Sequence, residues 1–285
     1  MDRDIDSLVR PDDERARATS SSGARAQDAA FPLSRDRETL ELRGYRYQLS
    51  PAELETLREI GRFRTLQTDD LARYRYRGNA PEMREDLGSL RAQGLIQQRT
   101  LWTGPKGGKV SLVVLTKPGK EILERTMAGS GQQLYAGFVK PAELAHDAAI
   151  YRMYQAEAGQ IERAGGRVRR VVLDYELKQK VYRPLAKIRP KAAASEYARQ
   201  QAQIAVQNRL KVVQGKILLP DLRIEYESAD GATAYVDLEL ATHHYRGAMM
   251  RGKADAGFKM YAPQDSVGRL SAAFDPELVA EIFSF

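Results

Sequence analysis

Apolar residues recur at helical spacing through residues 50–127, with short strand-like runs between the helical segments. Leu54, Leu57 and Ile60 fall on one face of a helix, which Ser50-Pro51-Ala52-Glu53 begins as a capping box with proline at the first helical position. Gly94 is a stop signal for the third helix. In chain order, the pattern predicts helices over 51–61, 68–74 and 81–93, strands over 95–102 and 110–115, and a closing helix over 116–127.

A second pattern follows beyond residue 140. Leu144, Ala148 and Tyr151 repeat along one face of a helix that can pack on a sheet. Asp230-Gly231 is a turn signal between two strand-like runs. The elements predicted here are a helix over 141–164, strands over 168–173 and 175–182 (or one long bent strand), a helix over 192–213, strands over 218–226 and 234–240, and a helix over 246–261. The chain is therefore expected to have an α+β fold.

Two segments lack such patterns. Residues 1–44 mix both signs of charge and hold one aromatic residue, Phe31, so they cannot bury enough apolar surface to offset chain ordering. Residues 129–140, which begin Gly129-Ser130-Gly131, are expected to be a linker. The sequence thus predicts a disordered arm over 1–44, one domain over 45–128, the linker, and a second domain over 141–285.

The order of the first domain has a further meaning. Three helices, a two-stranded hairpin and another helix, with Leu90-x-x-x-Gly94-Leu95-Ile96 and the segment LTKPGKEIL at 115–123, resemble winged helix-turn-helix DNA-binding domains. The resemblance implies that the third helix enters the major groove and the hairpin tip lies on the backbone. It places Arg84 and Arg91 toward the duplex, and Lys106 and Lys109 at phosphates. Some winged helices bind only protein, and that alternative stays open.

Charge favours a polyanionic partner. The chain has 45 Lys and Arg against 38 Asp and Glu, a net charge of +7. Residues 178–216 hold ten basic side chains and one acid, Glu196, so this basic segment carries +9. Such a block is typical of nucleic-acid binding, the alternative being a solvated basic helix without a partner. The residues expected to contact the DNA backbone here are Lys187, Arg189, Lys191, Arg199, Arg209 and Lys211.

Composition excludes several other classes. Because there is no cysteine, disulfide scaffolds, thiol catalysis and thiolate metal sites are excluded. Only three histidines are present, so a metal is expected to be held by oxygen. No apolar run approaches the roughly 18 residues of a membrane span, and the charged N-terminus has no signal-peptide core. We expect a soluble, cytoplasmic protein without a membrane partner.

Three acids are the candidates for chemistry. Asp237 and Glu239 lie two apart on one predicted strand and project from the same face, while Asp221 begins the neighbouring strand of the hairpin. Three carboxylates at one point require a hard cation such as Mg²⁺ (or Mn²⁺) between them, and that cation can orient a phosphodiester and activate water. The alternative is an exposed, charged sheet face.

These acids also carry a family resemblance. The segment LPDLRIEY at 219–226, followed by AYVDLELAT at 234–242 and a helix with Lys253, resembles the replication-relaxation proteins of plasmids and integrative elements. The segment LAHDAAIYRMY at 144–154, with His146, is similar to the start of that family's C-terminal half. Over about 49–262, the resemblance implies a winged helix joined to a PD-(D/E)XK restriction-endonuclease-like domain, with mobilisation relaxases among its relatives.

Two positions depart from the family pattern. The residue two beyond Glu239 is Ala241, where the nuclease pattern has lysine, so Lys253 or Lys259 would have to supply that charge. The first acid of the pair is aspartate, Asp237, where glutamate is expected. Without a substitute lysine, the domain would be a DNA-binding relic.

The histidines fit the chemistry less well. Adjacent residues on a strand point to opposite faces, so His243 and His244 cannot chelate one ion together, although one of them could join Asp221 and Glu239. Tyr245 as a covalent nucleophile is a further alternative, and His146 is expected to be a hydrogen-bonded structural residue.

Taken together, the sequence predicts a DNA-binding protein of a mobile element, acting in plasmid replication or mobilisation. The winged helix would find a duplex site, and Asp221, Asp237, Glu239 and Lys253 would nick or relax the DNA by metal-dependent hydrolysis. The alternative is a catalytically inactive DNA-binding regulator or replication factor. A protein-binding adaptor is a third reading, disfavoured by the basic segment. Other replication or transfer proteins are further expected partners.

Overall fold

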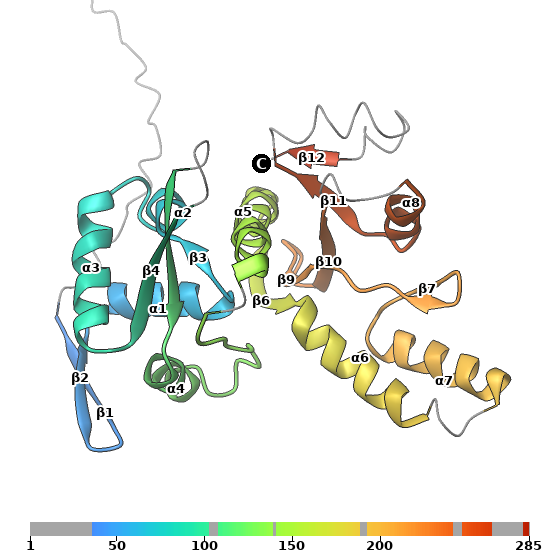
Figure 1. Cartoon of the computed structure of the whole chain (residues 1–285), viewed down its shortest axis with the longest axis horizontal. Coiled ribbons are helices and arrows are strands. Elements are labelled where there is room, and N and C mark those ends of the chain that lie inside the picture. The colour runs from blue at the N-terminus through green and yellow to red at the C-terminus, as the bar shows by residue number, and fades with distance from the viewer. Residues whose placement is uncertain are drawn as a thin grey trace, which may run out of the picture. The chain divides into compact units, whose positions relative to one another are not determined.

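A computed structural model describes residues 36–102, 108–138, 141–188, 193–241, 247–263 and 282–284. Within these ranges the chain is a mixed α+β protein with eight helices and several small sheets (Figure 1), as expected. None of the helices in the described ranges is long and apolar enough to cross a bilayer. Residues 1–35, most of the expected arm, lie outside the described ranges.

The N-terminal half, residues 36–138, places four helices around a three-stranded antiparallel sheet of order β3-β5-β4. The capping box is confirmed, because the Ser50 hydroxyl accepts from the Glu53 N–H while the Glu53 carboxylate accepts from the Ser50 N–H. Asn79 and Thr116 cap two of the other helices. The elements are α1 Pro51–Arg62, β3 Leu66–Gln67, α2 Thr68–Tyr74, α3 Ala80–Ala92, β4 Ile96–Trp102, β5 Lys109–Leu115 and α4 Lys117–Thr126.

A hairpin precedes these elements and corrects one expectation. β1 (Glu38–Leu42) pairs with β2 (Tyr45–Leu49), so residues 38–44 are not part of a disordered arm. Leu42 and Leu49 are buried against the core, and positive φ angles at Arg43 and Gly44 form the tight turn between the strands. Alternating apolar residues therefore outweigh the high charge of this segment.

The C-terminal half, residues 141–284, is built on a five-stranded sheet of order β12-β11-β10-β9-β6. β6, β9 and β10 are antiparallel neighbours, whereas β11 and β12 continue the sheet in parallel. Buried residues of α5 pack on one face of this sheet. The elements are α5 Pro141–Arg163, β6 Arg167–Leu173, β9 Leu222–Glu227, β10 Thr233–Leu240, α8 Gly247–Asp255, β11 Lys259–Ala262 and β12 Ile282–Ser284.

The basic segment lies between β6 and β9 and differs from the prediction. The connection between β6 and β9 is made of α6 (Asp174–Ile188), α7 (Ala194–Gln207) and the short hairpin of β7 (Val212–Val213) with β8 (Lys216–Ile217). The predicted strand over 175–182 is wrong, because Leu177, Val181 and Leu185 form a buried stripe at helical spacing. α7 ends six residues before its predicted end, and the chain turns into β7 instead. Figure 1 shows α6 and α7 side by side, joined by their own apolar cluster.

The helix predicted over 246–261 is also wrong in its second half. α8 ends at Asp255, and Gly257 adopts a positive φ that a side chain would strain. The chain then continues as β11, which adds to the sheet beside β10.

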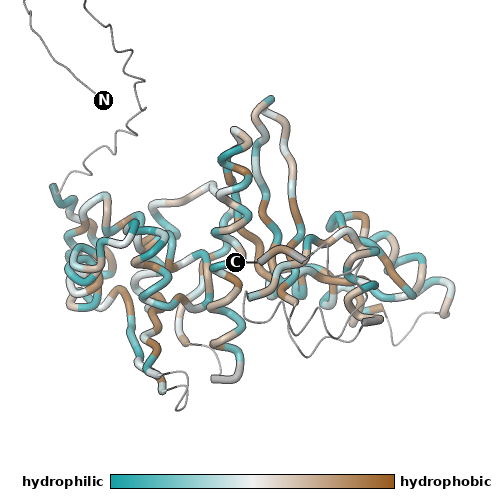
Figure 2. Tube along the Cα trace, turned by 90° about the horizontal axis from the view of Figure 1, so that it is seen from above, coloured by the Kyte–Doolittle hydropathy of each residue, from teal (hydrophilic) through white to brown (hydrophobic). Residues whose placement is uncertain are grey.

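The expected linker is packed rather than free. Leu134 is buried, and the Tyr135 N–H donates to the Gly61 carbonyl. α5 also contacts both halves, because the Tyr151 hydroxyl donates to Glu59 at 2.9 Å and Arg152 pairs with Asp70 at 2.8 Å. Figure 2 shows hydrophilic and hydrophobic residues mixed along the helices, in keeping with helices buried on one face.

Candidate functional site

Side chains alternate between the two faces of β9 and β10, and this alternation separates the candidate acids from the apolar core. Leu222 and Ile224 on β9, with Leu238 and Leu240 on β10, pack in the core that includes α5. Successive side chains of a strand point to opposite faces, so Asp237 and Glu239 face away from α5, toward the side of α6, α7 and α8.

Three of the four predicted catalytic residues meet at one end of the β9–β10 pair. Glu239, which is 1% exposed, accepts from the Asp221 N–H at 3.2 Å, and Asp221 accepts from the Leu240 N–H at 2.9 Å. Lys253 reaches over from α8, with its Nζ 2.7 Å from Glu239 Oε1. The helix after the hairpin thus places a lysine beside Glu239, where the nuclease pattern has a lysine at the position of Ala241. Lys259, the other candidate, pairs instead with Glu157 at 2.6 Å.

Asp237 does not join this group. Its two oxygens accept from Arg223 Nε at 2.6 Å and Nη2 at 2.8 Å, in a pair whose side chains are 8% and 5% exposed. The guanidinium also donates to the carbonyls of Asn208 and Arg209, and it lies over the ring of Tyr235 at 4.5 Å. The predicted convergence of three carboxylates is therefore not seen, because a buried guanidinium holds Asp237 in place.

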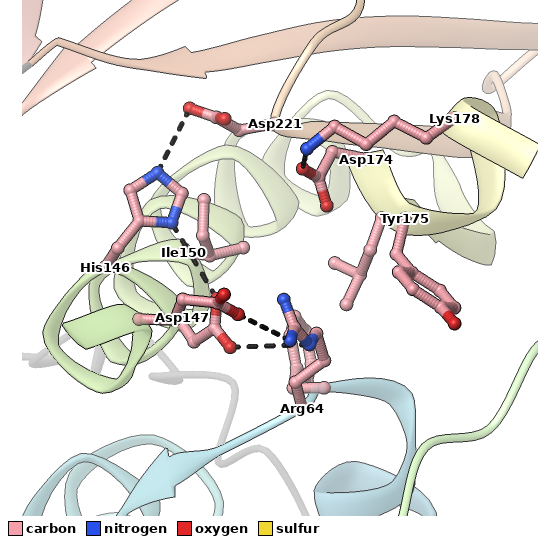
Figure 3. Close-up of a pocket in the computed structure, with 11 residues that line it drawn as sticks. Arg64, His146, Asp147, Ile150, Asp174, Tyr175, Lys178 and Asp221 are labelled. Atoms are coloured by element: carbon pink, nitrogen blue, oxygen red, sulfur yellow. Dashed lines mark hydrogen bonds and ion pairs between the residues drawn. The ribbon is translucent and has the colours of Figure 1, made fainter. Parts of the chain in front are cut away.

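The first turns of α5 add polar groups that the sequence did not assign to the site. His146 Nε2 lies 3.6 Å from Asp221 Oδ2, and its Nδ1 lies 3.7 Å from Asp147. Asp147 and then Asp221 raise the pKa of His146 to about 10, so the imidazole is positively charged at neutral pH. Figure 3 shows Arg64 of the N-terminal half approaching the same helix, where it pairs with Glu143 at 2.7 Å.

α6 forms the opposite wall (Figure 3). Lys178 is ion-paired with Asp174, and although burial opposes its charge, the bond with Asp174 raises the pKa of the lysine. Two cavities of about 580 Å³ each meet here, since Asp174, Lys178 and Asp221 line both of them. His146 and Arg64 line the first, which we call the α5 cavity. Glu239 and Lys253 line the second, which we call the α8 cavity.

Two of the three predicted metal ligands fit a divalent ion. Among the described residues, no group of three or more His, Asp or Glu side chains is placed to hold a metal. Mg²⁺ in phosphoryl-transfer sites is commonly held by one or two carboxylates, with water and substrate phosphate completing the shell. Asp221 and Glu239 are adjacent and both line the α8 cavity, so they are compatible with that mode, whereas Asp237 is not.

The predicted DNA-contacting residues are spread over both halves. Arg84 and Arg91 are exposed on α3, and Lys109 is exposed at the start of β5. Lys187 is exposed at the end of α6, and Arg199 is exposed but pairs with Glu196. Arg209 lies over the ring of Tyr235, and Lys211 donates to the Asp255 carbonyl at 3.3 Å. Outside the described residues lie the other predicted DNA contacts, Lys106, Arg189 and Lys191, and the alternative site residues His243, His244 and Tyr245.

Several residues of the site carried weak sequence signals. Lys178 and Asp174 are four residues apart, which is the spacing of an ion pair on a helix and contradicts the strand predicted over 175–182. Arg223 alternates with Leu222 and Ile224, and a basic residue inside an apolar strand predicts a buried acidic partner. Arg64 had no local signal, because its contacts are with α5, about eighty residues later.

Comparisons of the sequence with known protein families and with curated proteins find no match. A functional assignment therefore depends on the residues gathered around Asp221 and on the distribution of charge.

Proposed function

We propose that this chain is a DNA-processing protein of a mobile element, related to the replication-relaxation family, that nicks or relaxes DNA by metal-dependent phosphodiester hydrolysis. The observation that carries the proposal is the contact of Asp221, Glu239 and Lys253 at the end of β9 and β10, on the wall of a cavity. Two carboxylates beside a lysine are the groups that hydrolysis of a phosphodiester needs for holding a cation and balancing charge.

The order of elements supports the two modules of the proposal. α1, α2 and α3 followed by the β4–β5 hairpin and α4 is the order of a winged helix, with α3 as its groove-binding helix. The antiparallel strands β6, β9 and β10, followed by α8 and the parallel β11, are compatible with a restriction-endonuclease-like core. In that core Asp221, immediately before β9, and Glu239 of β10 would belong to the site.

Each residue has a role that follows from its contacts. Asp221 and Glu239 would hold Mg²⁺, which when bound orients a phosphodiester and makes bound water more acidic. Lys253 is held by Glu239 and by the Leu219 carbonyl, so its ammonium is fixed beside the carboxylates and can stabilise negative charge. His146 and Lys178 flank Asp221 as cations, on α5 and α6, and would attract the phosphate. Asp237 supports the strands through Arg223.

The test is relaxation of supercoiled plasmid in Mg²⁺ or Mn²⁺ by the wild type and by Glu239→Gln. The wild type should give open circles, and the variant should lose this activity while still binding duplex DNA. Glu225→Gln is the matched control, because Glu225 lies on β9 and outside the cavities around Asp221. Equal activity of the wild type and Glu239→Gln would overturn the assignment of the site.

A second candidate function has one observation in its favour. Glu239 is neutralised by Lys253 and Asp237 by Arg223, so the acids of β10 are compensated by the chain itself. A DNA-binding regulator with an inactive nuclease-like domain would show this pattern. Metal-independent duplex binding without nicking, on plasmids that carry a cognate site, is the outcome that would favour it.

A further inference from the structure

A third cavity, of about 670 Å³, opens beside the start of α4 and has no role in the proposed hydrolysis. We call it the α4 cavity. Its lining combines three cations with three aromatic rings: Arg64, Lys117, Lys120, Tyr135, Phe138 and Tyr175.

The cations are available to an anion from solvent. Lys117 is exposed, and Lys120 lies 3.5 Å from Glu124 on the next turn, so its pair is a long and solvated one. Arg64 also lines the cavity, although it is paired with Glu143. The α4 cavity therefore has a surplus of positive charge.

The rings lie next to these cations. Tyr135 and Tyr175 are in edge contact, with ring centroids 6.3 Å apart, and Arg64 lies over the ring of Tyr175 at 5.9 Å. Tyr175 is 49% exposed, so about half of this residue is accessible to a ligand. Aromatic rings stack with nucleobases, and lysines beside them bind phosphates, so the combination suits a nucleotide.

The α4 cavity adjoins the candidate site. Arg64, Glu143 and Tyr175 line both the α4 cavity and the α5 cavity. The α5 cavity in turn shares Asp221 and Lys178 with the α8 cavity. All three lie along α6, which contributes Tyr175, Lys178 and Tyr182 to their walls.

We propose that the α4 cavity binds a nucleotide of the same DNA strand that is cleaved at Asp221, with its phosphate at Lys117 and Lys120 and its base on Tyr175. The inference rests on the proposed function. The strand then follows α6 through the three cavities, and its base is unpaired where it meets the ring.

The experiment measures binding of a fluorescein-labelled oligothymidylate of about ten nucleotides. The full chain is used in EDTA, so that no cleavage takes place. Tyr175→Ala and the double variant Lys117→Gln, Lys120→Gln should each bind the oligonucleotide about tenfold more weakly, because one stacked base or two phosphate contacts are lost. Tyr175→Phe keeps the ring and should bind like the wild type. The matched controls Tyr45→Ala and Arg46→Gln, on the exposed β2, should also bind like the wild type.

Unchanged oligonucleotide binding by Tyr175→Ala and by the double lysine variant would overturn the inference. An equal loss of duplex binding would overturn it too, since it would show a general charge effect. Because no metal and no cleavage are involved, these results are independent of whether the wild type nicks plasmid DNA. A wild type that fails to nick but shows the tenfold effect would refute the hydrolysis and leave the nucleotide site.

Discussion

Asp237 and Glu239 lie two residues apart on the same strand and face of the sheet, yet their surroundings are opposite. Asp237 is enclosed by Arg223, whose guanidinium is itself saturated by two backbone carbonyls and a tyrosine ring. Glu239 lies at the strand end, where Asp221 and Lys253 leave a cavity beside it. Buried charge that is fully paired holds strands together, whereas buried charge beside a cavity is available for chemistry.

The largest expected effect concerns stability. Asp237→Ala leaves a buried guanidinium without its carboxylate, so we expect the free energy of unfolding to fall by about 3–5 kcal/mol. Urea unfolding with an unchanged m-value measures this. Asp230→Ala, on the exposed β9–β10 turn, should cost less than about 1 kcal/mol. The double variant Arg223→Met, Asp237→Leu should recover most of the loss, because no unpaired charge then stays buried. If Asp237→Ala lowered the free energy of unfolding as little as Asp230→Ala, Asp237 would not be a structural residue and would belong to the site.

Asp221→Asn should show the reverse profile. Its amide oxygen can still accept from the Leu240 N–H, so stability should change by less than about 1 kcal/mol. Plasmid nicking should fall by roughly 100-fold or more, because one of the two proposed carboxylate ligands of the cation is lost. The comparison fails if Asp221→Asn unfolds as readily as Asp237→Ala while retaining its activity.

Metal binding separates the two regions a third way. At a Mg²⁺ concentration about ten times Kd, a single site in the folded protein raises the free energy of unfolding by about 1.4 kcal/mol. This stabilisation should persist in Asp237→Asn and disappear in Asp221→Asn, as measured by thermal unfolding at several Mg²⁺ concentrations. If the stabilisation by Mg²⁺ were lost in Asp237→Asn alone, the ion would be bound at Asp237 and not at Asp221.

The smallest expected effect is a titration. In metal-free protein, NMR should give the His146 imidazole a pKa of about 10, with Asp147→Asn lowering it more than Asp221→Asn does. Because this folded-state pKa lies above the ordinary 6.5, the stability that it contributes is complete below about pH 6.5. That contribution is lost as the pH rises through about 10. An ordinary pKa in the wild type would mean that the two carboxylates do not face the ring in solution.

The sequence predicted the elements whose signals are local. The capping box of α1, the helical stripe of α5 and the turn at Asp230-Gly231 each depend on residues a few positions apart, and all lie where expected. It failed on α6, where a strand was predicted over 175–182 although the buried stripe is helical. It also failed on the end of α8, where Gly257 releases the chain into β11.

Only the part of the candidate site that depends on the alternation of side chains along the strands could be predicted from the sequence. Alternation placed Asp237 and Glu239 on one face, and the position of Asp221 at a strand start put it near Glu239. The sequence does not show that Arg223 pairs with Asp237. That ion pair depends on which acid lies opposite the guanidinium once β9 and β10 have paired. His146 and Arg64 reach the site because α5 packs between segments that are distant in the sequence. Such packing cannot be predicted from the local pattern of residues.

The single helix α5 has a mechanical consequence. It is 23 residues long, about 35 Å, and one stretch of it is fastened to α1 and α2 through Tyr151 and Arg152. Its first turns carry His146 and Asp147 at the site. Because α5 is fixed both to the N-terminal half and to the sheet of the C-terminal half, the two halves cannot rotate independently. On the proposed function, the distance from the bound duplex to the cut phosphate is then set by the protein, so cleavage would occur at a constant offset from the recognised sequence.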